Sequence, residues 1–283
     1  MTFKSHIHKS ARLAPDSLVN RSAGITLAVS AHWPGFPEKF DWIAANGFGL
    51  EYSPDPSHFE RVTSHLAPYL ENSLPVRHHA YFPGLEIADA DGRMAERAMT
   101  VHYQAIDAIK GVGNPVVTVH IGLPAGRPLD LDRAKNNLTA LVGYGRKNGI
   151  RVNIENLRSG PASNPDTIME WAEVSGAGIT MDIGHAVSSD AVRQGTFTAP
   201  EIVDLFAPRL DEIHLYESET DTHHAPEDLS ILGPIFDRLV LTGCRWWTIE
   251  LDDYRQILHT RHLVRQYLAD SHCGRHLVAN EMV

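Results

Sequence analysis

Short apolar runs alternate with longer segments of helical spacing from about residue 24 to residue 270. Each run of four to six residues suits a strand that is buried on both faces, as in a parallel sheet. In the longer segments apolar residues recur three or four positions apart, which is typical of a helix with one buried face. The pattern predicts strands at 25–29, 48–52, 76–80, 116–121, 151–154, 179–183, 212–216 and 246–251.

Glycine and proline mark most of the predicted boundaries, as helix ends and starts often require. One helix begins at Asp91 and ends before Gly111. The other helices are predicted at 37–46, 56–70, 130–148, 165–174, 200–206, 229–240 and 254–269. Eight strand–helix alternations predict the α/β class, and the count favours a single closed (β/α)8 TIM barrel over an open doubly wound sheet. No glycine-rich phosphate loop opens a helix.

The length of 283 residues suits one barrel domain, predicted at 23–270, between a flexible N-terminal arm at 1–22 and a flexible tail at 271–283. No apolar run approaches the roughly 20 residues that cross a bilayer, and the arm lacks a secretory signal. The two cysteines give no disulfide framework. We therefore expect a cytoplasmic protein without a membrane partner. The net charge of −10 argues against non-specific nucleic-acid binding. The oligomeric state stays open, a homo-oligomer included.

Acids and histidines stand at the ends of six successive predicted strands. In Gly178–His185 the buried run ends at Asp182, and His185 follows three residues later. The other strand ends supply His78 with His79, His120, Glu155, His214 with Asp221 and His223 in its loop, and Glu250. In a closed barrel these positions converge over one mouth, where barrel enzymes keep their chemistry.

The combination of carboxylates and imidazoles predicts a metal site at this mouth. Any one of these residues alone is weak evidence, because a strand-end His often bonds a backbone carbonyl and a Glu often pairs with Arg. Together they would carry strongly coupled charge unless a cation neutralises it. The donor types suit Zn²⁺, Mn²⁺ or Fe²⁺ and not a thiolate-selective ion, and we expect Zn²⁺ or Mn²⁺. Strand alternation points His78 and His79 to opposite sides, and we expect His78 to face the mouth.

Four short motifs carry a family resemblance: Asp-Ile-Gly-His at 182–185, Ile-Glu-Asn at 154–156, Asp-Thr-His at 221–223 after His214, and Ile-Glu-Leu at 249–251. With them the chain resembles the xylose isomerase-like TIM barrel superfamily over about residues 24–270. That superfamily includes sugar isomerases and epimerases as well as endonuclease IV. The isomerases and epimerases hold one divalent ion, which the resemblance assigns here to Glu155, Asp182, His214 and Glu250. It also implies that Glu155 and Glu250 are the catalytic residues that move protons.

Endonuclease IV instead holds three Zn²⁺ with nine ligands. By resemblance these fall on His78, His120, Glu155, Asp182, His185, His214, Asp221, His223 and Glu250. The chain departs from the nuclease pattern at Pro83, Gly84 and Glu86, and at Ile183-Gly184, where the nuclease has Thr-Cys. These departures count against cleavage at abasic sites in nucleic acid.

The resemblance favours a divalent-metal-dependent isomerase or epimerase that acts on a small sugar or polyol. It would move a proton next to a carbonyl through an enediolate. His185, Arg158 and Tyr81 are the predicted substrate-binding residues. Arg158 is the nearest basic alternative to an arginine that epimerases carry after the strand-seven His, although an ordinary surface Arg fits equally well. The alternatives are an endonuclease IV-like zinc phosphodiesterase and a barrel that only binds a partner, without a metal.

Overall fold

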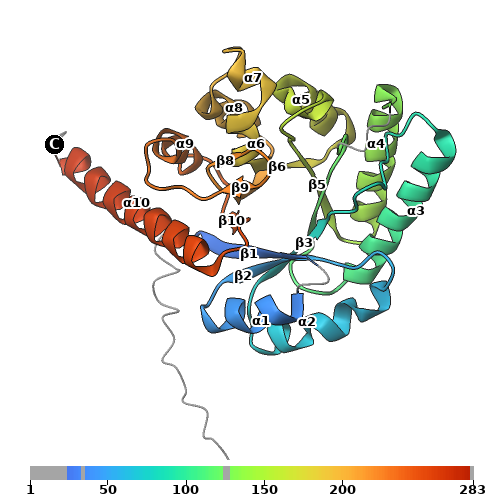
Figure 1. Ribbon diagram of the computed structural model, residues 1–283, viewed down its shortest axis with the longest axis horizontal. Helices are drawn as coiled ribbons and strands as arrows, with labels where there is room; N and C mark the ends of the chain where they lie inside the picture. The colour runs from blue at the N-terminus through green and yellow to red at the C-terminus, as the bar shows by residue number, and fades with distance from the viewer. Residues whose placement is uncertain (1–23, 33–35, 124–127, 281–283) are drawn as a thin grey trace, which may run out of the picture.

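Eight parallel strands close into a barrel in the computed structural model, which describes residues 24–32, 36–123 and 128–280 (Figure 1). Around the barrel the order is β1-β10-β7-β6-β5-β4-β3-β2. The strands are β1 Thr26–His32, β2 Gly49–Ser53, β3 Val76–Ala80, β4 Val116–Val119, β5 Arg151–Glu155, β6 Gly178–Asp182, β7 Leu210–Leu215 and β10 Trp246–Ile249. The prediction of a closed (β/α)8 barrel is confirmed.

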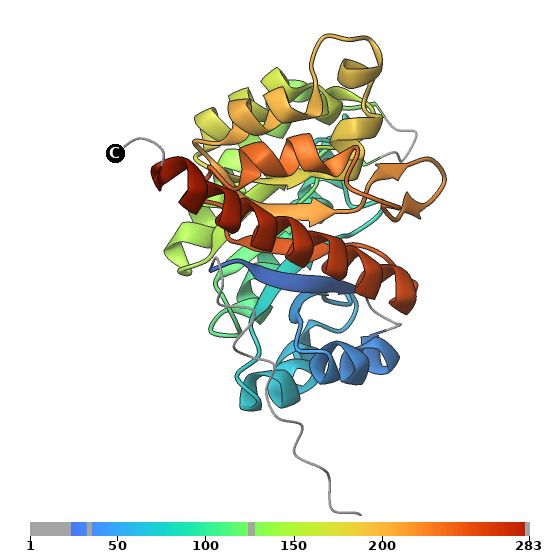
Figure 2. The same ribbon diagram turned by 90° about the vertical axis from the view of Figure 1, so that its left-hand side faces the viewer.

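Helices surround the strands, and α10 runs along the outside next to β1 (Figure 2). They are α1 Phe36–Ala45, α2 Val62–Glu71, α3 Gly92–Ile109, α4 Leu131–Lys147, α5 Pro165–Ser175, α8 Ala199–Phe206, α9 Leu232–Leu239 and α10 Tyr254–Asn280. The last helix continues past its predicted end at 269, so residues 271–280 are helical. The predicted arm at 1–22 lies outside the described residues. Among the described residues no helix combines the length and the apolar character that a membrane span needs.

Side chains cap several of these helices at the residues where the sequence places them. The carboxylate of Asp91 accepts a hydrogen bond from the backbone N–H of Arg93, and Asp130 accepts one from Arg133. Asn164 caps α5 in front of a proline at its first position. Such caps satisfy backbone donors that the first helical turn leaves free. They explain why the predicted and observed helix starts agree to within a residue at α3, α4 and α5.

Two pairs of short elements between β6 and β10 are absent from the predicted pattern. Short helices α6 Ile183–Ser188 and α7 Asp190–Arg193 follow β6, and an antiparallel hairpin of β8 Ser218–Glu219 and β9 His223–His224 follows β7. They are too short for apolar periodicity to reveal. Both lie at the carboxyl ends of their strands and therefore border the barrel mouth.

The barrel interior is polar, although every strand is buried. Thr118 on β4 bonds Thr180 on β6 at 2.7 Å, and Arg77 on β3 donates to Glu212 on β7 at 3.1 Å. These pairs join strands that are not neighbours, so the bonds cross the inside of the barrel. The apolar residues at alternate positions face the surrounding helices. Along each strand, residues that face the barrel interior thus alternate with residues that face the helices. Thr180 is an interior residue and not part of an apolar run.

Candidate metal centre

Glu155, the last residue of β5, lies in the middle of a buried group of histidines. Its Oε2 is 3.0 Å from His120 Nε2, 3.3 Å from His79 Nε2 and 3.3 Å from His214 Nδ1. The side chain is 1% exposed. Burial would raise the pKa of Glu155, but His120 and His214 outweigh it and hold the pKa well below the usual value. Glu155 is therefore ionised at neutral pH.

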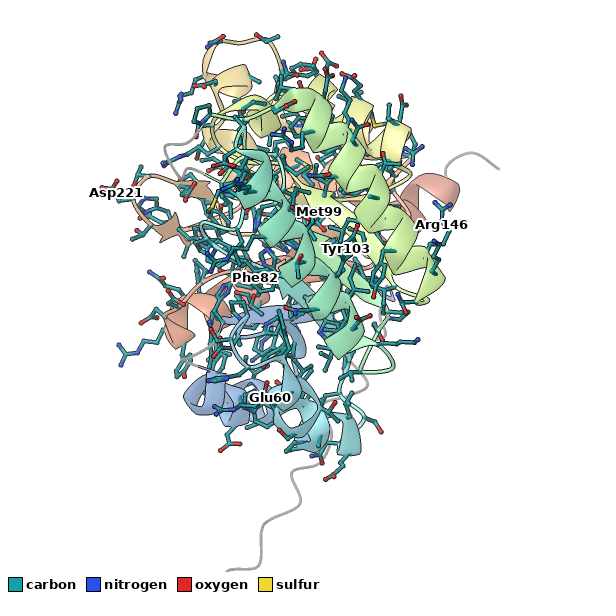
Figure 3. The ribbon with its side chains drawn as sticks, turned by 90° about the vertical axis from the view of Figure 1, so that its right-hand side faces the viewer. Glu60, Phe82, Met99, Tyr103, Arg146 and Asp221 are labelled. Atoms are coloured by element: carbon teal, nitrogen blue, oxygen red, sulfur yellow. The ribbon has the colours of Figure 1, made fainter. Side chains whose placement is uncertain are left out.

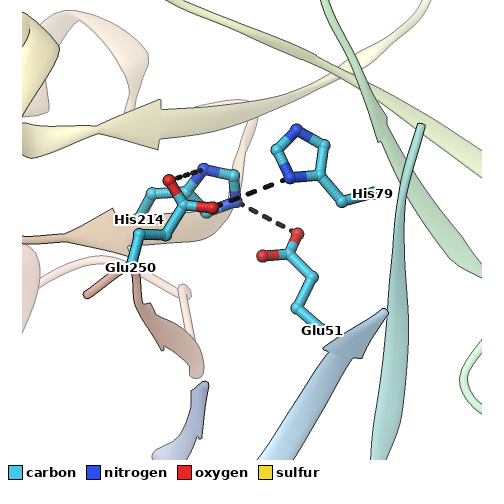
Figure 4. A group of neighbouring side chains, drawn as sticks. All are labelled: Glu51, His79, His214 and Glu250. Atoms are coloured by element: carbon cyan, nitrogen blue, oxygen red, sulfur yellow. Dashed lines mark hydrogen bonds and ion pairs between the residues drawn. The ribbon is translucent and has the colours of Figure 1, made fainter. Parts of the chain in front are cut away.

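Glu250, which directly follows β10, contacts two of the same histidines, His79 and His214 (Figure 4). Its Oε1 is 3.6 Å from His79 Nδ1, and its Oε2 is 3.5 Å from His214 Nδ1. Burial would raise the pKa of Glu250, but His214 and His79 hold it far below the usual value. The two ionised glutamates thus contact opposite nitrogens of the His79 ring and share Nδ1 of His214.

Asp182 completes the group and is fixed by several hydrogen bonds at the end of β6. Its Oδ1 accepts the backbone N–H of His185 at 2.6 Å and so caps α6, and its Oδ2 accepts the hydroxyl of Tyr216 at 3.0 Å. Asn156 exchanges two 2.9 Å hydrogen bonds with the Asp182 backbone. Burial raises the pKa of Asp182 to about 6. We refer below to His79, His120, Glu155, Asp182, His214 and Glu250 as the strand-end cluster.

The strand-end cluster has the donors that a divalent cation needs. Its members fall into overlapping sets whose ligand atoms lie within 4.8 Å of one another, including His79 with His120 and Glu155, and Glu155 with Asp182 and His214. Several of these atoms have no hydrogen bond of good geometry within the described part of the chain: His79 Nδ1, Glu155 Oε2, His214 Nδ1 and Glu250 Oε1. Buried polar atoms without partners are costly, and a shared cation would satisfy them. Carboxylate oxygens and imidazole nitrogens suit Zn²⁺ or Mn²⁺.

A cavity of about 350 Å³ opens above the cluster. Glu155, Glu250 and His120 form part of its wall, together with His32, Tyr81, Arg158, His185, Glu219 and His223. Arg158 Nε is 3.4 Å from Glu219 Oε2, which is also 3.3 Å from His185 Nε2. The volume is near the lower end of the range for small-molecule sites. The three predicted substrate-binding residues therefore line one cavity over the cluster.

The known proteins that the chain resembles share this architecture. A family model described as the xylose isomerase-like TIM barrel matches residues 39–269. The chain belongs to this family.

Comparison with individual relatives extends the same result. An uncharacterized protein of Methanocaldococcus jannaschii is 33% identical over 164 residues, which are 58% of this chain and 70% of the relative. The crystal structure of a D-tagatose 3-epimerase-like protein superposes with a TM-score of 0.73 at 18% identity, covering 92% of this chain and 100% of that one. Endonuclease IV from Thermus thermophilus gives a TM-score of 0.62 at 15% identity, with 87% and 99% covered. At these identities the two structures show a shared fold.

In this xylose isomerase-like barrel the prediction for β3 is wrong, because His79 and not His78 faces the mouth. The Nε2 of His78 lies 2.7 Å from the carbonyl oxygen of Val112, in the loop after α3, so this ring is outside the barrel. Alternation along β3 puts Arg77 and His79 inside. The apolar pattern cannot determine the phase of this strand, since both histidines are buried.

The hairpin after β7 corrects the nine-ligand prediction at a second position. Asp221 is exposed at the bend between β8 and β9, at the outer tip of the hairpin (Figure 3). His223 does lie beside the mouth, because its ring stacks on Tyr216 with centroids 3.9 Å apart and its Nδ1 is 2.8 Å from the Glu250 carbonyl oxygen. The two-residue strands of the hairpin leave Asp221 too far out to join the cluster.

Three residues near the cluster were missed from the sequence. Glu51 on β2 lies with its Oε1 3.1 Å from His214 Nε2. His32 ends β1, beyond the predicted end of that strand, and Glu219 lies in the unpredicted hairpin. A carboxylate inside the apolar run 48–52 was the available signal for Glu51, because an isolated buried acid needs a partner.

Metal binding at the cluster is expected to strengthen as pH rises. Burial would lower the pKa of His79, but Glu51, Glu155 and Glu250 raise it to about 10, and Glu250, Glu51 and Glu155 hold the pKa of His214 well above its usual value. These raised pKa values favour the doubly protonated imidazolium in the absence of metal, and a ring must lose one of its two protons before that nitrogen can bind a metal ion. Affinity should rise about tenfold per pH unit for each released proton. Calorimetric titration between pH 6 and 8, in buffers of different ionisation enthalpy, measures this release; pH-independent affinity would contradict it.

Proposed function

We propose that the protein is a divalent-metal-dependent isomerase or epimerase of a small sugar or polyol. The observation that carries the proposal is the pair Glu155 and Glu250, which flank one imidazole-rich cluster beneath a cavity of about 350 Å³. The D-tagatose 3-epimerase-like fold supports it. The reaction would move a proton on the carbon next to a carbonyl, through an enediolate.

Glu155, Asp182, His214 and Glu250 would hold the metal ion in this proposal. When bound, the ion supplies Lewis-acid polarisation of a carbonyl and its neighbouring hydroxyl. Glu155 and Glu250 act as the base and the acid: one removes the proton next to the carbonyl, and the other returns a proton at the neighbouring carbon or the opposite face. Both carboxylates are held ionised before substrate binds, so either can act as the base, and the one that returns a proton would first take that proton up from solvent. Asp182, fixed by Tyr216 and by the start of α6, holds its position throughout.

The charge of the cavity favours an uncharged substrate over a sugar phosphate. Among the described residues that line it, Arg158 is the one lysine or arginine. Its guanidinium lies against Glu219, so its charge is already matched. A phosphate group would need an uncommitted cation or a set of backbone donors for its two negative charges. The hydroxyl groups of a free sugar suit the neighbouring histidines and carboxylates better.

The test is proton exchange between substrate and solvent. Metal-loaded protein is incubated in D₂O with a panel of ketoses, aldoses and polyols, and deuterium incorporation is followed by NMR. The proposal predicts incorporation at the carbon next to the carbonyl of at least one sugar, abolished by a chelator and restored by Mn²⁺ or Zn²⁺. Absence of exchange across the panel, with a single ion bound, would contradict it.

An endonuclease IV-like phosphodiesterase is the second candidate, and one observation favours it. Glu155 belongs to two donor sets at once, one with His79 and His120 and one with Asp182 and His214, as a residue bridging two ions would. The exposed Asp221 counts against a third ion. Elemental analysis distinguishes the two, because about three zinc ions per chain and cleavage of an abasic-site duplex would support the nuclease. An uncut duplex would exclude the repair role.

Removing the metal is expected to lower thermal stability, which also tests the third interpretation, a barrel that binds no metal. A ligand at 100 times its Kd stabilises the folded state by about 2.7 kcal/mol, since it binds the folded state alone. Melting of chelator-treated protein with and without added Zn²⁺ or Mn²⁺ measures the effect. Equal melting temperatures would favour the metal-free interpretation.

A further inference from the structure

A buried carboxylate lies beneath the strand-end cluster and contacts it through one histidine. Glu51 on β2 is fully buried, and its Oε1 is 3.1 Å from His214 Nε2 (Figure 4). The other nitrogen of the same ring, Nδ1, is 3.3 Å from Glu155 Oε2 and 3.5 Å from Glu250 Oε2. The two nitrogens of the His214 ring therefore contact different carboxylates, Nε2 that of Glu51 and Nδ1 those of Glu155 and Glu250.

A neutral imidazole carries one N–H and one lone pair, and the partner at one nitrogen decides which nitrogen keeps the proton. A carboxylate accepts and cannot donate when ionised, so Glu51 selects the tautomer with the proton on Nε2. The lone pair then lies on Nδ1 and points toward Glu155 and Glu250. Carboxylates behind ligating histidines orient the ring and increase its basicity.

We propose that Glu51 is a positioning residue that holds His214 in the tautomer and orientation needed to bind a metal ion through Nδ1. The inference rests on the proposed function only in requiring a cation at the strand-end cluster. It assigns no contact between Glu51 and the substrate.

The alternative role for Glu51 is that of a direct ligand, in a set with His79, His214 and Glu250 whose donor atoms also lie within 4.8 Å of one another. An ion shared by Glu51 and Nε2 would lie at the edge of the His214 ring away from Glu155. Such an ion would leave His214 Nδ1 with only its contacts to Glu155 and Glu250, neither of which is a hydrogen bond of good geometry. The positioning role uses both nitrogens of the ring, and the geometry favours it.

The residues around Glu51 also explain why its carboxylate bonds His214. Glu212 lies one layer deeper in the barrel and pairs with Arg77 at 3.1 Å. Burial and the neighbouring Glu51 raise the pKa of Glu212 to about 8. Arg77 thus pairs with Glu212. The Oε2 atom of Glu51 has no hydrogen-bond partner in the described structure. His214 is the one hydrogen-bond partner of the Glu51 carboxylate among the described residues.

The experiment compares metal affinity in wild type, Glu51→Gln and Glu51→Asp by chelator competition with Zn²⁺ and Co²⁺. Gln removes the negative charge and places beside His214 an amide that can donate as well as accept a hydrogen bond. Asp keeps the charge, but its side chain is one methylene group shorter. We expect affinity to fall about 10–100-fold in Glu51→Gln and less in Glu51→Asp, with unchanged stoichiometry and an unchanged Co²⁺ absorption spectrum. Glu212→Gln is the matched buried control and should bind Co²⁺ like wild type.

A histidine NMR spectrum of the Zn²⁺-loaded protein supplies a readout that a merely structural role would not move. The proton of His214 should lie on Nε2 in wild type, and Glu51→Gln should broaden or shift that signal. Unchanged affinity in Glu51→Gln would overturn the positioning role, and so would a changed Co²⁺ spectrum or a lost ion, which would make Glu51 a ligand. Lower affinity together with no proton exchange on any sugar would sustain the inference and refute the isomerase. Wild type that binds no metal would refute both.

Discussion

Glu155→Gln is expected to lower the rate of proton exchange by about 10²–10⁴-fold, the range that one general acid–base residue contributes. The amide cannot accept the substrate proton. It also replaces a carboxylate that lies within 3.3 Å of three histidines. The measurement is kcat for solvent exchange in metal-loaded protein, with metal content determined on the same sample. A variant that keeps its metal and loses turnover separates the chemical role from ligation.

Glu170→Gln is the matched surface control for this substitution. Glu170 on α5 is exposed, pairs with Lys135 at 2.9 Å and is not among the described residues that line the cavity. Exposed ion pairs of this kind contribute little to stability. The control should retain wild-type turnover and melting temperature. A Glu155→Gln variant as active as Glu170→Gln would remove Glu155 from the mechanism.

Gly184→Ala is expected to destabilise the folded protein at the upper end of the range for overpacked cores, about 3 kcal/mol. A Cβ at this position would lie 1.9 Å from Cε2 of the Tyr216 ring. The ring cannot move aside freely, because it stacks on His223 and its hydroxyl bonds Asp182. Displacing Tyr216 would also release Asp182, so metal affinity should fall along with the free energy of unfolding. Urea denaturation and a metal titration measure the two effects.

Gly143→Ala provides the contrasting glycine. Gly143 lies inside α4, and a Cβ there would meet nothing within 4 Å. Alanine is the better helix former by roughly 0.5–1 kcal/mol, so this variant should be as stable as wild type or more so. If Gly184→Ala proved no more destabilising than Gly143→Ala, the close packing of α6 against Tyr216 would not exist in solution.

The fold was predictable because the signals for it are local. Strand β3 has its predicted bounds, and the caps at Asp91, Asp130 and Asn164 begin helices where the sequence indicates. The convergence of Glu155, Asp182, His214 and Glu250 followed from the count of strands, since a closed barrel leaves one common mouth.

The phase of a strand with two buried faces was not predictable. His78 and His79 are both buried, one against a loop and one in the cluster, and neither apolar pattern nor polarity separates them. The role of Glu51 was unpredictable for a related reason. Its partner His214 lies on β7, which is not a neighbour of β2, so the apolar run around Glu51 does not reveal the contact. Strand register across the barrel decides such contacts, and it depends on closure of the whole ring.

The loops at the mouth were the least predictable part. Glu219 reaches the cavity because its backbone N–H donates to Ser188 Oγ at 2.8 Å and its carboxylate pairs with His185 and Arg158. These contacts join segments from three different loops. The same hairpin carries Asp221 outward to an exposed position, against the ligand pattern of endonuclease IV. Short loops vary freely on a barrel, so their contacts set specificity without a periodic signal.

The most direct test of the metal centre is an anomalous-difference map from crystals grown with Mn²⁺ or Zn²⁺. We predict a peak at the carboxyl ends of β5, β6, β7 and β10, about 2.0–2.3 Å from His214 Nδ1 and from oxygens of Glu155, Asp182 and Glu250. A fully metal-supplied crystal with no peak there, or with peaks only at exposed histidines, would contradict the account.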